Sequence, residues 1–479
     1  MILRVINHPY EFDMKNLCIT FFPHEKIRLE GEEDPVVVTT RRETDGSLFV
    51  SAKVYDVYRE TTAKPEPADE EHLVLSVTLY RLLSGILGFA PPWGVLYGVR
   101  PAKLMHRLCA QMGDDAAVAH FQTAFLTQKS KAELAHEVML HENRSIARSG
   151  PKSFSLYVSI PFCPTRCAYC SFVSHSIEKT HKLMTPYVDL LLRELEETSK
   201  YAKELGLELA TVYFGGGTPT TLSAQDLGRI FSTIEQNFDL SHLMEYTVEA
   251  GRPDTVTRER LEVIQAAGVQ RISINPQSFN DKVLEAIGRR HTAQQTLDAF
   301  ALARDCGFDH INMDFIAGLP EDDLPSFQRS IQTALDLQAE SITVHTLALK
   351  TSAYMVTREQ TFDLKDRLTV SNMVDYAGQT LHGAGYYPYY MYRQSKSLGN
   401  LENVGWCKPG YDCLYNVYMM DETHTVLAVG AGAVTKLRGQ NSGMIERIYN
   451  YKYPYEYIRD FDTLLERKKR IPGFYAEYD

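Results

Sequence analysis

The middle of the chain alternates short apolar runs with longer segments in which apolar positions recur every three to four residues. In 182–204, for example, Val188, Leu191, Leu192 and Leu195 mark one face of a helix. The short runs have the length of buried strands. The expected strands are 154–160, 210–214, 245–249, 270–274, 310–315 and 342–346.

Strands that alternate with helices predict a parallel sheet with right-handed crossovers. Glycines 206, 268 and 307 follow three of the amphipathic segments, as expected for helix C-caps. Six strand–helix units predict an α/β fold with an open, partial (β/α)6 barrel. The expected helices are 182–204, 223–237, 254–267, 292–306 and 324–337.

The flanks of this pattern are less regular. Residues 1–150 combine short alternating strands with helical stretches and predict an N-terminal α+β domain of unknown role. The barrel is expected in 151–382, and 383–479 is expected to form a C-terminal domain that covers the substrate. Its tyrosines either stack on a macrocycle or form ordinary core and rim. Those around Pro388 are Tyr386, Tyr387, Tyr389, Tyr390 and Tyr392.

Bulk properties fit a large cytoplasmic enzyme. The 479 residues are 44% hydrophobic and 23% charged, which is ordinary globular usage. The apolar runs are too short to span a membrane, and the N-terminus has no signal-peptide pattern. A formal net charge of −11 argues against bulk nucleic-acid binding but leaves room for an anionic substrate held by local arginines.

Polar or unusual residues follow every expected strand. Barrel active sites gather at the carboxyl ends of the strands, so these residues predict one shared site. In strand order they are a cysteine loop, Gly215-Gly-Gly-Thr-Pro219, Glu249, Asn275-Pro-Gln277, Asp314 and His345.

Three cysteines lie in the loop after the first strand. Cys163, Cys167 and Cys170 have the spacing C-x3-C-x2-C, and three thiolates can hold three irons of a 4Fe–4S cluster. Structural zinc sites and ferredoxin clusters use four protein ligands, so the set predicts a cluster with one iron open to a small molecule. The alternative is three buried free thiols. Cys407 and Cys413 either hold a second cluster or are free cysteines.

The triple glycine follows the second strand. Residues without Cβ let backbone amides and carbonyls approach a ligand closely, and a polar zwitterion suits such a backbone. The alternative is a tight turn without a ligand.

Several motifs resemble, in order, the radical S-adenosylmethionine (SAM) barrel of the oxygen-independent coproporphyrinogen III oxidase family. With two C-terminal stretches and the long N-terminal extension, the chain resembles the HemZ-type coproporphyrinogen dehydrogenases of this family. The barrel motifs are Tyr157-Val-Ser-Ile-Pro-Phe-Cys163, Cys167-Ala-Tyr-Cys170, Phe214-Gly-Gly-Gly-Thr-Pro219, Val248-Glu249, Arg271-Ile-Ser-Ile-Asn-Pro-Gln277, Gly288-Arg-Arg-His291 and Asn312-Met-Asp-Phe-Ile-Ala-Gly-Leu-Pro320. The C-terminal stretches are 392–405 and 429–435.

The resemblance implies a role for each matching residue. The three loop cysteines ligate the cluster, and Glu249 accepts hydrogen bonds from the ribose hydroxyls of SAM. For Gln277, Arg289 and Asp314 the alternative is a strand-end cap or a surface ion pair. The implied SAM-binding residues are Tyr157, Tyr169, Gly216, Gly217, Thr218, Glu249, Gln277, Arg289 and Asp314.

Three departures limit the resemblance. Phe172 stands where the oxidases proper carry a fourth cysteine, and Ser159 stands where they carry a histidine. The segment 414–419 lacks the histidine that related heme chaperones use to ligate heme. Roles of those groups are therefore not transferred.

The implied activity is oxygen-independent oxidative decarboxylation of coproporphyrinogen III to protoporphyrinogen IX in heme biosynthesis. The implied cofactors are a 4Fe–4S cluster and SAM, and the implied electron donor is a low-potential protein such as flavodoxin or ferredoxin. Two alternatives remain: a radical SAM enzyme that modifies or degrades heme, and a heme-trafficking protein.

A tetrapyrrole substrate with four propionates requires cations in this acidic chain. Arginine binds carboxylates through its planar fork. The candidates are Arg252, Arg290, Arg393 and Lys396, and the alternative for each is a solvated surface charge.

Overall fold

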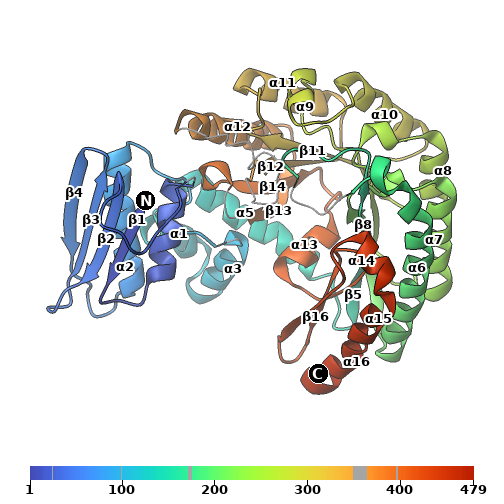
Figure 1. Cartoon of the computed structure of the whole chain (residues 1–479), viewed down its shortest axis with the longest axis horizontal. Coiled ribbons are helices and arrows are strands. Elements are labelled where there is room, and N and C mark those ends of the chain that lie inside the picture. Colours follow the sequence, from blue (N-terminus) through green and yellow to red (C-terminus); the bar gives the residue numbers. More distant parts are fainter. Residues whose placement is uncertain (24, 99, 171–174, 349–363, 395–396) are drawn as a thin grey trace.

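The computed structural model describes residues 1–479 apart from 24, 99, 171–174, 349–363 and 395–396. An 11-stranded mixed sheet dominates the described part, and its centre curves into an open barrel (Figure 1). Six adjacent strands of that centre are parallel, which confirms the α/β class and the partial (β/α)6 barrel. In spatial order they are β5 (Ser153–Ile160), β8 (Glu208–Gly216), β9 (Glu245–Glu249), β10 (Arg271–Ser273), β11 (Ile311–Ala317) and β12 (Ser341–Thr346).

Helices connect these strands and form the outer rim of the barrel (Figure 1). Four of them begin after a side chain that accepts a hydrogen bond from the backbone N–H three residues later, namely Ser223, Thr257, Thr292 and Asp323. The expected C-cap glycines 206, 268 and 307 all have positive φ. The helices are α6 (Ile177–Glu204), α7 (Ala224–Asn237), α8 (Arg258–Ala266), α9 (Asp281–Ala286), α10 (Ala293–Asp305) and α11 (Leu324–Asp336).

The two faces of the barrel strands differ in chemistry, because successive residues of a strand point to opposite sides. Outward residues such as Leu156, Val158, Val212 and Phe214 belong to the large apolar core beneath the helices. The inner face carries polar and aromatic side chains instead. They include Ser155, Tyr157, Thr211, Tyr213, Thr247, Glu249, Ser273, Asn312, Asp314, Thr343 and His345.

The C-terminal segment extends this sheet at both edges. β14 (Glu402–Cys407) pairs antiparallel with β12, and β15 (Thr425–Val429) pairs parallel with β5. The domain boundary expected at 383 therefore crosses a continuous sheet and remains a prediction. The other elements of this segment are α12 (Leu364–Gly383), β13 (Tyr387–Arg393), η4 (Leu398–Asn400), α13 (Leu414–Asp421), β16 (Val434–Arg438), β17 (Ile445–Tyr449), α14 (Pro454–Arg459), α15 (Phe461–Lys468) and α16 (Arg470–Tyr478).

A buried carboxylate at the start of β9 holds α13 inside the barrel. Glu245 accepts hydrogen bonds from the backbone N–H groups of Leu414 and Tyr415, the first residues of that helix. The Cys413 thiol lies 3.4 Å from the same carboxylate. These donors would otherwise be unpaired in the interior, so Glu245 fixes where α13 enters.

The N-terminal region divides between two cores. Its first part forms a four-stranded sheet with two helices and has an apolar core of its own. Trp93 and the buried apolar residues of α3, α4 and α5 belong to the barrel core, whereas Val95 belongs to the N-terminal core. The expected single unit 1–150 thus has no break in packing at its C-terminal boundary. The elements are β1 (Ile2–Ile6), α1 (Glu11–Phe21), β2 (Val36–Arg42), β3 (Leu48–Val54), β4 (Val57–Ala63), α2 (Glu71–Leu87), α3 (Pro101–Met112), α4 (Asp114–Thr123) and α5 (Lys129–Ile146).

Polar contacts join this region to the C-terminal segment. The buried Lys131 ammonium lies 2.6 Å from Glu402 and 2.8 Å from Asp375. The Trp93 indole N–H donates to the other oxygen of Glu402 at 2.7 Å. Because every charge here has a partner, the desolvation cost of the junction is offset.

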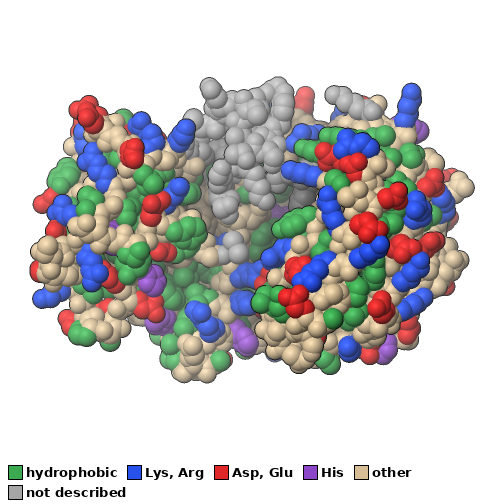
Figure 2. All heavy atoms as spheres, turned by 60° about the horizontal axis from the view of Figure 1, so that its bottom comes forward, with side chains coloured by type: hydrophobic (Ala, Val, Ile, Leu, Met, Phe, Trp, Pro, Cys, Tyr) green, Lys and Arg blue, Asp and Glu red, His purple; other side chains and the backbone are tan. Residues whose placement is uncertain are grey.

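Charges on the surface are mixed. On the face shown in Figure 2, acidic and basic side chains are interspersed over both parts of the molecule, among the residues described. None of the described helices is long and apolar enough to cross a lipid bilayer.

Replacing Lys468 tests the closure of the barrel by the C-terminal helices. Its ammonium lies 2.6 Å from the equally buried Glu194, which also accepts hydrogen bonds from Asn450 and Tyr457. Removing one partner of a buried pair leaves an uncompensated charge, so Lys468→Met should cost about 3–5 kcal/mol of unfolding free energy in urea denaturation.

The neighbouring residue supplies the control. Lys469 pairs with Glu466 in solvent, and Lys469→Met should change stability by no more than about 0.5 kcal/mol. Equal effects of the two substitutions would contradict a closure that depends on the buried pair.

Candidate functional site

The cysteine loop lies at the carboxyl edge of the barrel, directly after β5. Phe162–Cys163 form the short strand β6, which pairs with β7 (His175–Ser176). The loop is anchored to the turn after α9, because the Ala168 N–H donates to the Ile287 carbonyl and the Thr165 hydroxyl to that of Gly288. The Cys167 side chain is buried; Cys163 and Cys170 are partly exposed.

The triple glycine brings β8 and its following turn, η1 (Pro219–Thr221), against this loop. A Cβ on Gly217 would lie 2.5 Å from the Phe162 carbonyl oxygen, so only glycine fits there. The N–H groups of Gly217 and Thr218 donate to the carbonyls of Ile160 and Phe162, both at 2.7 Å. These two amides therefore bond the protein, while the Thr218 hydroxyl lies 3.4 Å from the Cys163 sulfur.

Glu249 ends β9 and faces the barrel interior. The Tyr213 hydroxyl donates to its carboxylate at 2.6 Å. Burial raises the pKa of Glu249 to about 7, and the hydrogen bond from Tyr213 only partly offsets this effect. A carboxyl group with this pKa changes charge near neutral pH.

Asp314 lies on the same inner face and behaves differently. Burial alone would raise its pKa, but hydrogen bonding and charge from His345, together with the Asn312 amide, hold the pKa below its ordinary value. The Asn312 amide donates to Asp314 at 2.7 Å, and the His345 ring nitrogen lies 3.7 Å from the other oxygen. The interior thus holds two carboxyl groups whose pKa values are shifted in opposite directions.

Tyrosines from two parts of the chain stack inside the barrel. The ring of Tyr415 from α13 stacks on Tyr213 with centroids 4.4 Å apart, and on Tyr157 at 5.9 Å. Sequence reasoning had placed Tyr157 at the site but missed Tyr213 and Tyr415. Tyr213 on β8 pairs with Tyr157 on β5. Because alternate residues of a strand face the same side, the position of Tyr213 in its strand could have indicated that it faces the barrel interior.

The expected pocket residues after β10 surround a buried guanidinium. Arg289 donates to the Asn275 carbonyl at 2.6 Å and to the Tyr169 hydroxyl at 3.3 Å. Gln277 has a φ of 67° and bonds the backbone of β11 beyond the end of β10. Within the described structure, the Asn275 side-chain oxygen and the Arg289 Nε are buried without a hydrogen-bond partner.

Arg252 contacts the cysteine loop. Its guanidinium holds Asp254 through two bonds of 3.0 Å, donates to the Thr165 hydroxyl at 3.1 Å, and lies 3.7 Å from the Cys167 sulfur. The side chain is 3% exposed.

Three of the four expected substrate cations are described, and their guanidinium groups are engaged at different places. Arg393 is buried at the junction with the N-terminal region, where it stacks over Trp93 and donates to the carbonyls of Leu96 and Asn400. These contacts engage its guanidinium away from a substrate. Lys396 lies outside the described residues.

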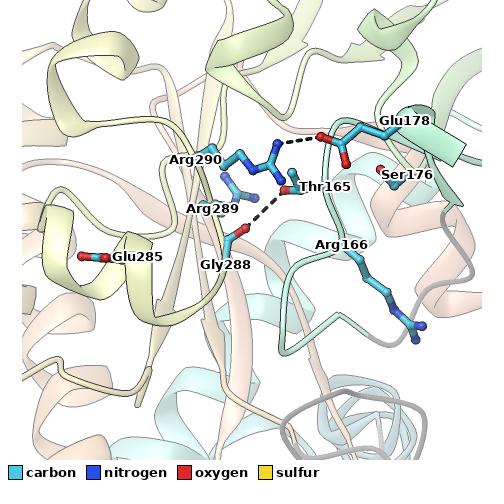
Figure 3. Close-up of a pocket in the computed structure, with 8 residues that line it drawn as sticks. All are labelled: Thr165, Arg166, Ser176, Glu178, Glu285, Gly288, Arg289 and Arg290. Atoms are coloured by element: carbon cyan, nitrogen blue, oxygen red, sulfur yellow. Dashed lines mark hydrogen bonds and ion pairs between the residues drawn. The ribbon is translucent and has the colours of Figure 1, made fainter.

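Arg290 lines a surface pocket of about 500 Å³ on the outer side of the cysteine loop. Figure 3 shows Arg290 paired with Glu178, and Thr165 bonded to Gly288, within this pocket. The Arg290 side chain is 68% exposed, so it lies at the surface rather than in the barrel interior.

Comparison with known proteins agrees with this geometry. Residues 157–334 match the model of the radical SAM superfamily. The oxygen-independent coproporphyrinogen-III oxidase-like protein HemZ of Bacillus subtilis (strain 168) is 34% identical, over 95% of this chain and 94% of its own. The heme chaperone HemW of Haemophilus influenzae is 30% identical, over 66% of this chain and 78% of its own.

Among solved structures, coproporphyrinogen III oxidase (HemN) from Escherichia coli has a similar fold. It aligns with a TM-score of 0.51 and 21% identity, over 68% of this chain and 72% of its own. This likeness supports the barrel fold.

The family uses a 4Fe–4S cluster and SAM, and the residues present fit both. Three thiols on one loop supply a cluster donor set with one iron left open. The buried and unpartnered Asn275 oxygen and Arg289 Nε offer an acceptor and a donor, which suit a polar zwitterion.

The pKa of Glu249 predicts a pH-dependent stability of the protein without SAM. Its folded pKa is raised, so protonation stabilises the fold below pH 4.5, and this stabilisation is lost as pH rises to about 7. The loss amounts to about 3 kcal/mol at roughly 1.4 kcal/mol per pKa unit. Urea denaturation between pH 4.5 and 8 should show this decline relative to Glu249→Gln, which cannot ionise. Parallel profiles would contradict it.

Proposed function

The chain belongs to the radical SAM family of oxygen-independent coproporphyrinogen-III oxidase-like proteins, and we propose that it acts as a coproporphyrinogen dehydrogenase. The proposed reaction converts two propionates of coproporphyrinogen III into the vinyl groups of protoporphyrinogen IX, in heme biosynthesis. Each conversion would release carbon dioxide, give one hydrogen atom to a 5′-deoxyadenosyl radical and pass one electron to an electron acceptor. The observation that carries this proposal is the similarity to the HemZ protein over 95% of the chain, which extends well beyond the barrel.

We propose that Cys163, Cys167 and Cys170 hold the cluster. When bound, the cluster and SAM supply a low-potential electron and a 5′-deoxyadenosyl radical, which removes hydrogen from a propionate side chain. A low-potential protein such as a flavodoxin or ferredoxin is the proposed electron donor. The partly exposed Cys163 and Cys170 agree with delivery from the protein surface.

The chain's own side chains bind and orient the reactants in this proposal. Glu249 accepts the ribose hydroxyls of SAM, and the Tyr213 hydroxyl holds the carboxylate in place. Arg289, Gln277 and Asp314, with Tyr157, Tyr169, Gly216, Gly217 and Thr218, are the proposed remaining SAM contacts. The tyrosine stack with Tyr415 closes the interior and excludes water from the radical.

The three described arginines that were expected to bind the substrate propionates are engaged elsewhere or exposed. Arg252 and Arg393 use their guanidinium groups within the protein, and Arg290 lies at the outer surface. The family, rather than a cluster of arginines, therefore supports the proposal that the substrate is a tetrapyrrole.

Heme trafficking is the second candidate, because heme chaperones are among the relatives. The segment 414–419 that resembles their heme-binding stretch carries no histidine and forms part of α13, where Tyr415 stacks with Tyr157 and Tyr213. This packing disfavours heme ligation by that segment.

The test is anaerobic incubation of the cluster-reconstituted protein with SAM, a reductant and coproporphyrinogen III, followed by mass analysis. Protoporphyrinogen IX, methionine and 5′-deoxyadenosine should form together. Formation of 5′-deoxyadenosine without decarboxylation would favour a different radical substrate such as heme. The absence of both products would favour heme trafficking.

Cysteine variants test the cluster assignment. We expect the broad visible absorbance of the cluster to be lost in each of Cys163→Ala, Cys167→Ala and Cys170→Ala. The rate of SAM cleavage should fall at least about 100-fold, because losing a ligand costs at least as much as losing a residue that only supports a ligand. Cys306→Ala and Cys407→Ala, which alter cysteines outside the loop, should retain both. Retained cleavage in Cys167→Ala would overturn the assignment.

A further inference from the structure

Two buried guanidinium groups approach the same cysteine. Arg252 from the end of β9 lies 3.7 Å from the Cys167 sulfur, and the Arg289 guanidinium contributes charge and a hydrogen bond to that thiol. Both arginines are at least nine-tenths buried, so solvent screens their charge only weakly.

The contacts of Arg252 leave little capacity for a substrate. A guanidinium has five N–H groups. Four are used: two on Asp254, one on Thr165 and one on Cys167. The bidentate pair with Asp254 fixes the plane of the guanidinium group. The Nη1 donors then contact Thr165 and Cys167 of the cysteine loop.

We propose that Arg252 is a positioning residue that raises the reduction potential of the cluster through its N–H donation to the Cys167 sulfur. Hydrogen bonds to cluster sulfurs and nearby positive charge stabilise the more negative, reduced state. Asp254 is the partner that orients it. The proposal rests on the proposed function, because it requires Cys167 as a cluster ligand.

The test uses the reconstituted full-length protein without SAM, with the reduction potential measured by an electron-paramagnetic-resonance titration. Arg252→Gln removes the charge and most donors, and should shift the potential to more negative values. Arg252→Lys keeps the positive charge but loses the planar guanidinium, and Asp254→Glu keeps the carboxylate charge but moves its oxygens away from the guanidinium. Both should shift the potential less, in the same direction.

Arg258→Gln is the matched control. Arg258 donates to the Cys306 sulfur at 3.8 Å from α8, outside the cysteine loop, and its loss should leave the potential unchanged. Iron content is measured for each variant. If Arg252→Gln fails to retain iron, Arg252→Lys and Asp254→Glu decide the question.

Two results would overturn the proposal. One is an unchanged potential in all three variants at wild-type iron content. The other is a raised KM for coproporphyrinogen at unchanged potential, which would make Arg252 a substrate ligand. Either result leaves the cluster assignment intact, since Cys167→Ala tests that assignment separately.

A second, independent observation lies in the N-terminal helices. The Cys109 thiol near the end of α3, the Asp114 carboxylate at the start of α4 and a His136 ring nitrogen on α5 have ligand atoms within 4.8 Å of one another. The His136 Nε2 lies 3.0 Å from the Asp114 carboxylate. Cys109 and His136 are partly exposed, so the group is open to an ion from solvent.

We propose that these three side chains bind a divalent zinc ion. One sulfur, one nitrogen and one oxygen are ligands that zinc accepts, with water in the fourth tetrahedral position. The ion would link three successive helices whose inner faces share the barrel core. Its proposed effect is to stabilise this helical region.

The test adds zinc chloride to the full-length protein after cluster reconstitution, so that the loop cysteines are already occupied. Wild type should bind one zinc equivalent more than Cys109→Ser or His136→Gln by calorimetry and metal analysis, and its melting temperature should rise with zinc. Cys306→Ser, another partly exposed cysteine, is the control and should bind like wild type.

Melting without zinc shows whether each variant is folded. Equal zinc uptake by wild type and a folded Cys109→Ser or His136→Gln variant would overturn this second proposal. So would zinc uptake by wild type that leaves its melting temperature unchanged.

Discussion

The open side of a six-stranded parallel barrel is the constraint on which this structure depends. Such a sheet ends in two edge strands, β5 and β12, whose backbone groups would be left unpaired. The chain satisfies both with later strands, β15 on one side and β14 on the other. Residues after 400 are therefore needed to complete the barrel, and Lys468 pairs with Glu194 of α6 to hold that closure from outside.

The same closure sets the electrostatics of the interior. α13 carries Tyr415 onto Tyr157 and Tyr213, and the Tyr213 hydroxyl bonds Glu249. Burial raises the pKa of Glu249 on β9, whereas hydrogen bonding and charge from His345 outweigh burial and lower the pKa of Asp314 on β11. One interior consequently holds an acid and a base form near neutral pH, although both groups are carboxyls on strands of one sheet.

The local sequence was enough to predict the barrel strands, their helices and the cysteine loop. The spacing of apolar residues, the helix-capping residues and the glycines that end helices all lie within short segments. It was not enough for contacts between distant segments. Tyr415 lies more than 200 residues from Tyr157, and Arg393 meets Trp93 across about 300 positions. Arg252 was expected to bind a substrate because it follows the end of a strand. Its hydrogen bonds to Asp254 and Thr165 instead orient its guanidinium group toward the cysteine loop.

Several arginines are buried although the chain as a whole is acidic. Arg252, Arg271, Arg289 and Arg393 are each at least nine-tenths buried in a chain of net charge −11. Where carboxylates, carbonyls or sulfurs accept the N–H groups of a buried guanidinium, these partners indicate its role. In the described structure the Nε and Nη1 atoms of Arg271 have no hydrogen-bond partner. Arg393 bonds carbonyls at a domain junction, whereas Arg252 and Arg289 face Cys167. Positive charge is thus placed beside the cysteine loop, although the chain as a whole is acidic.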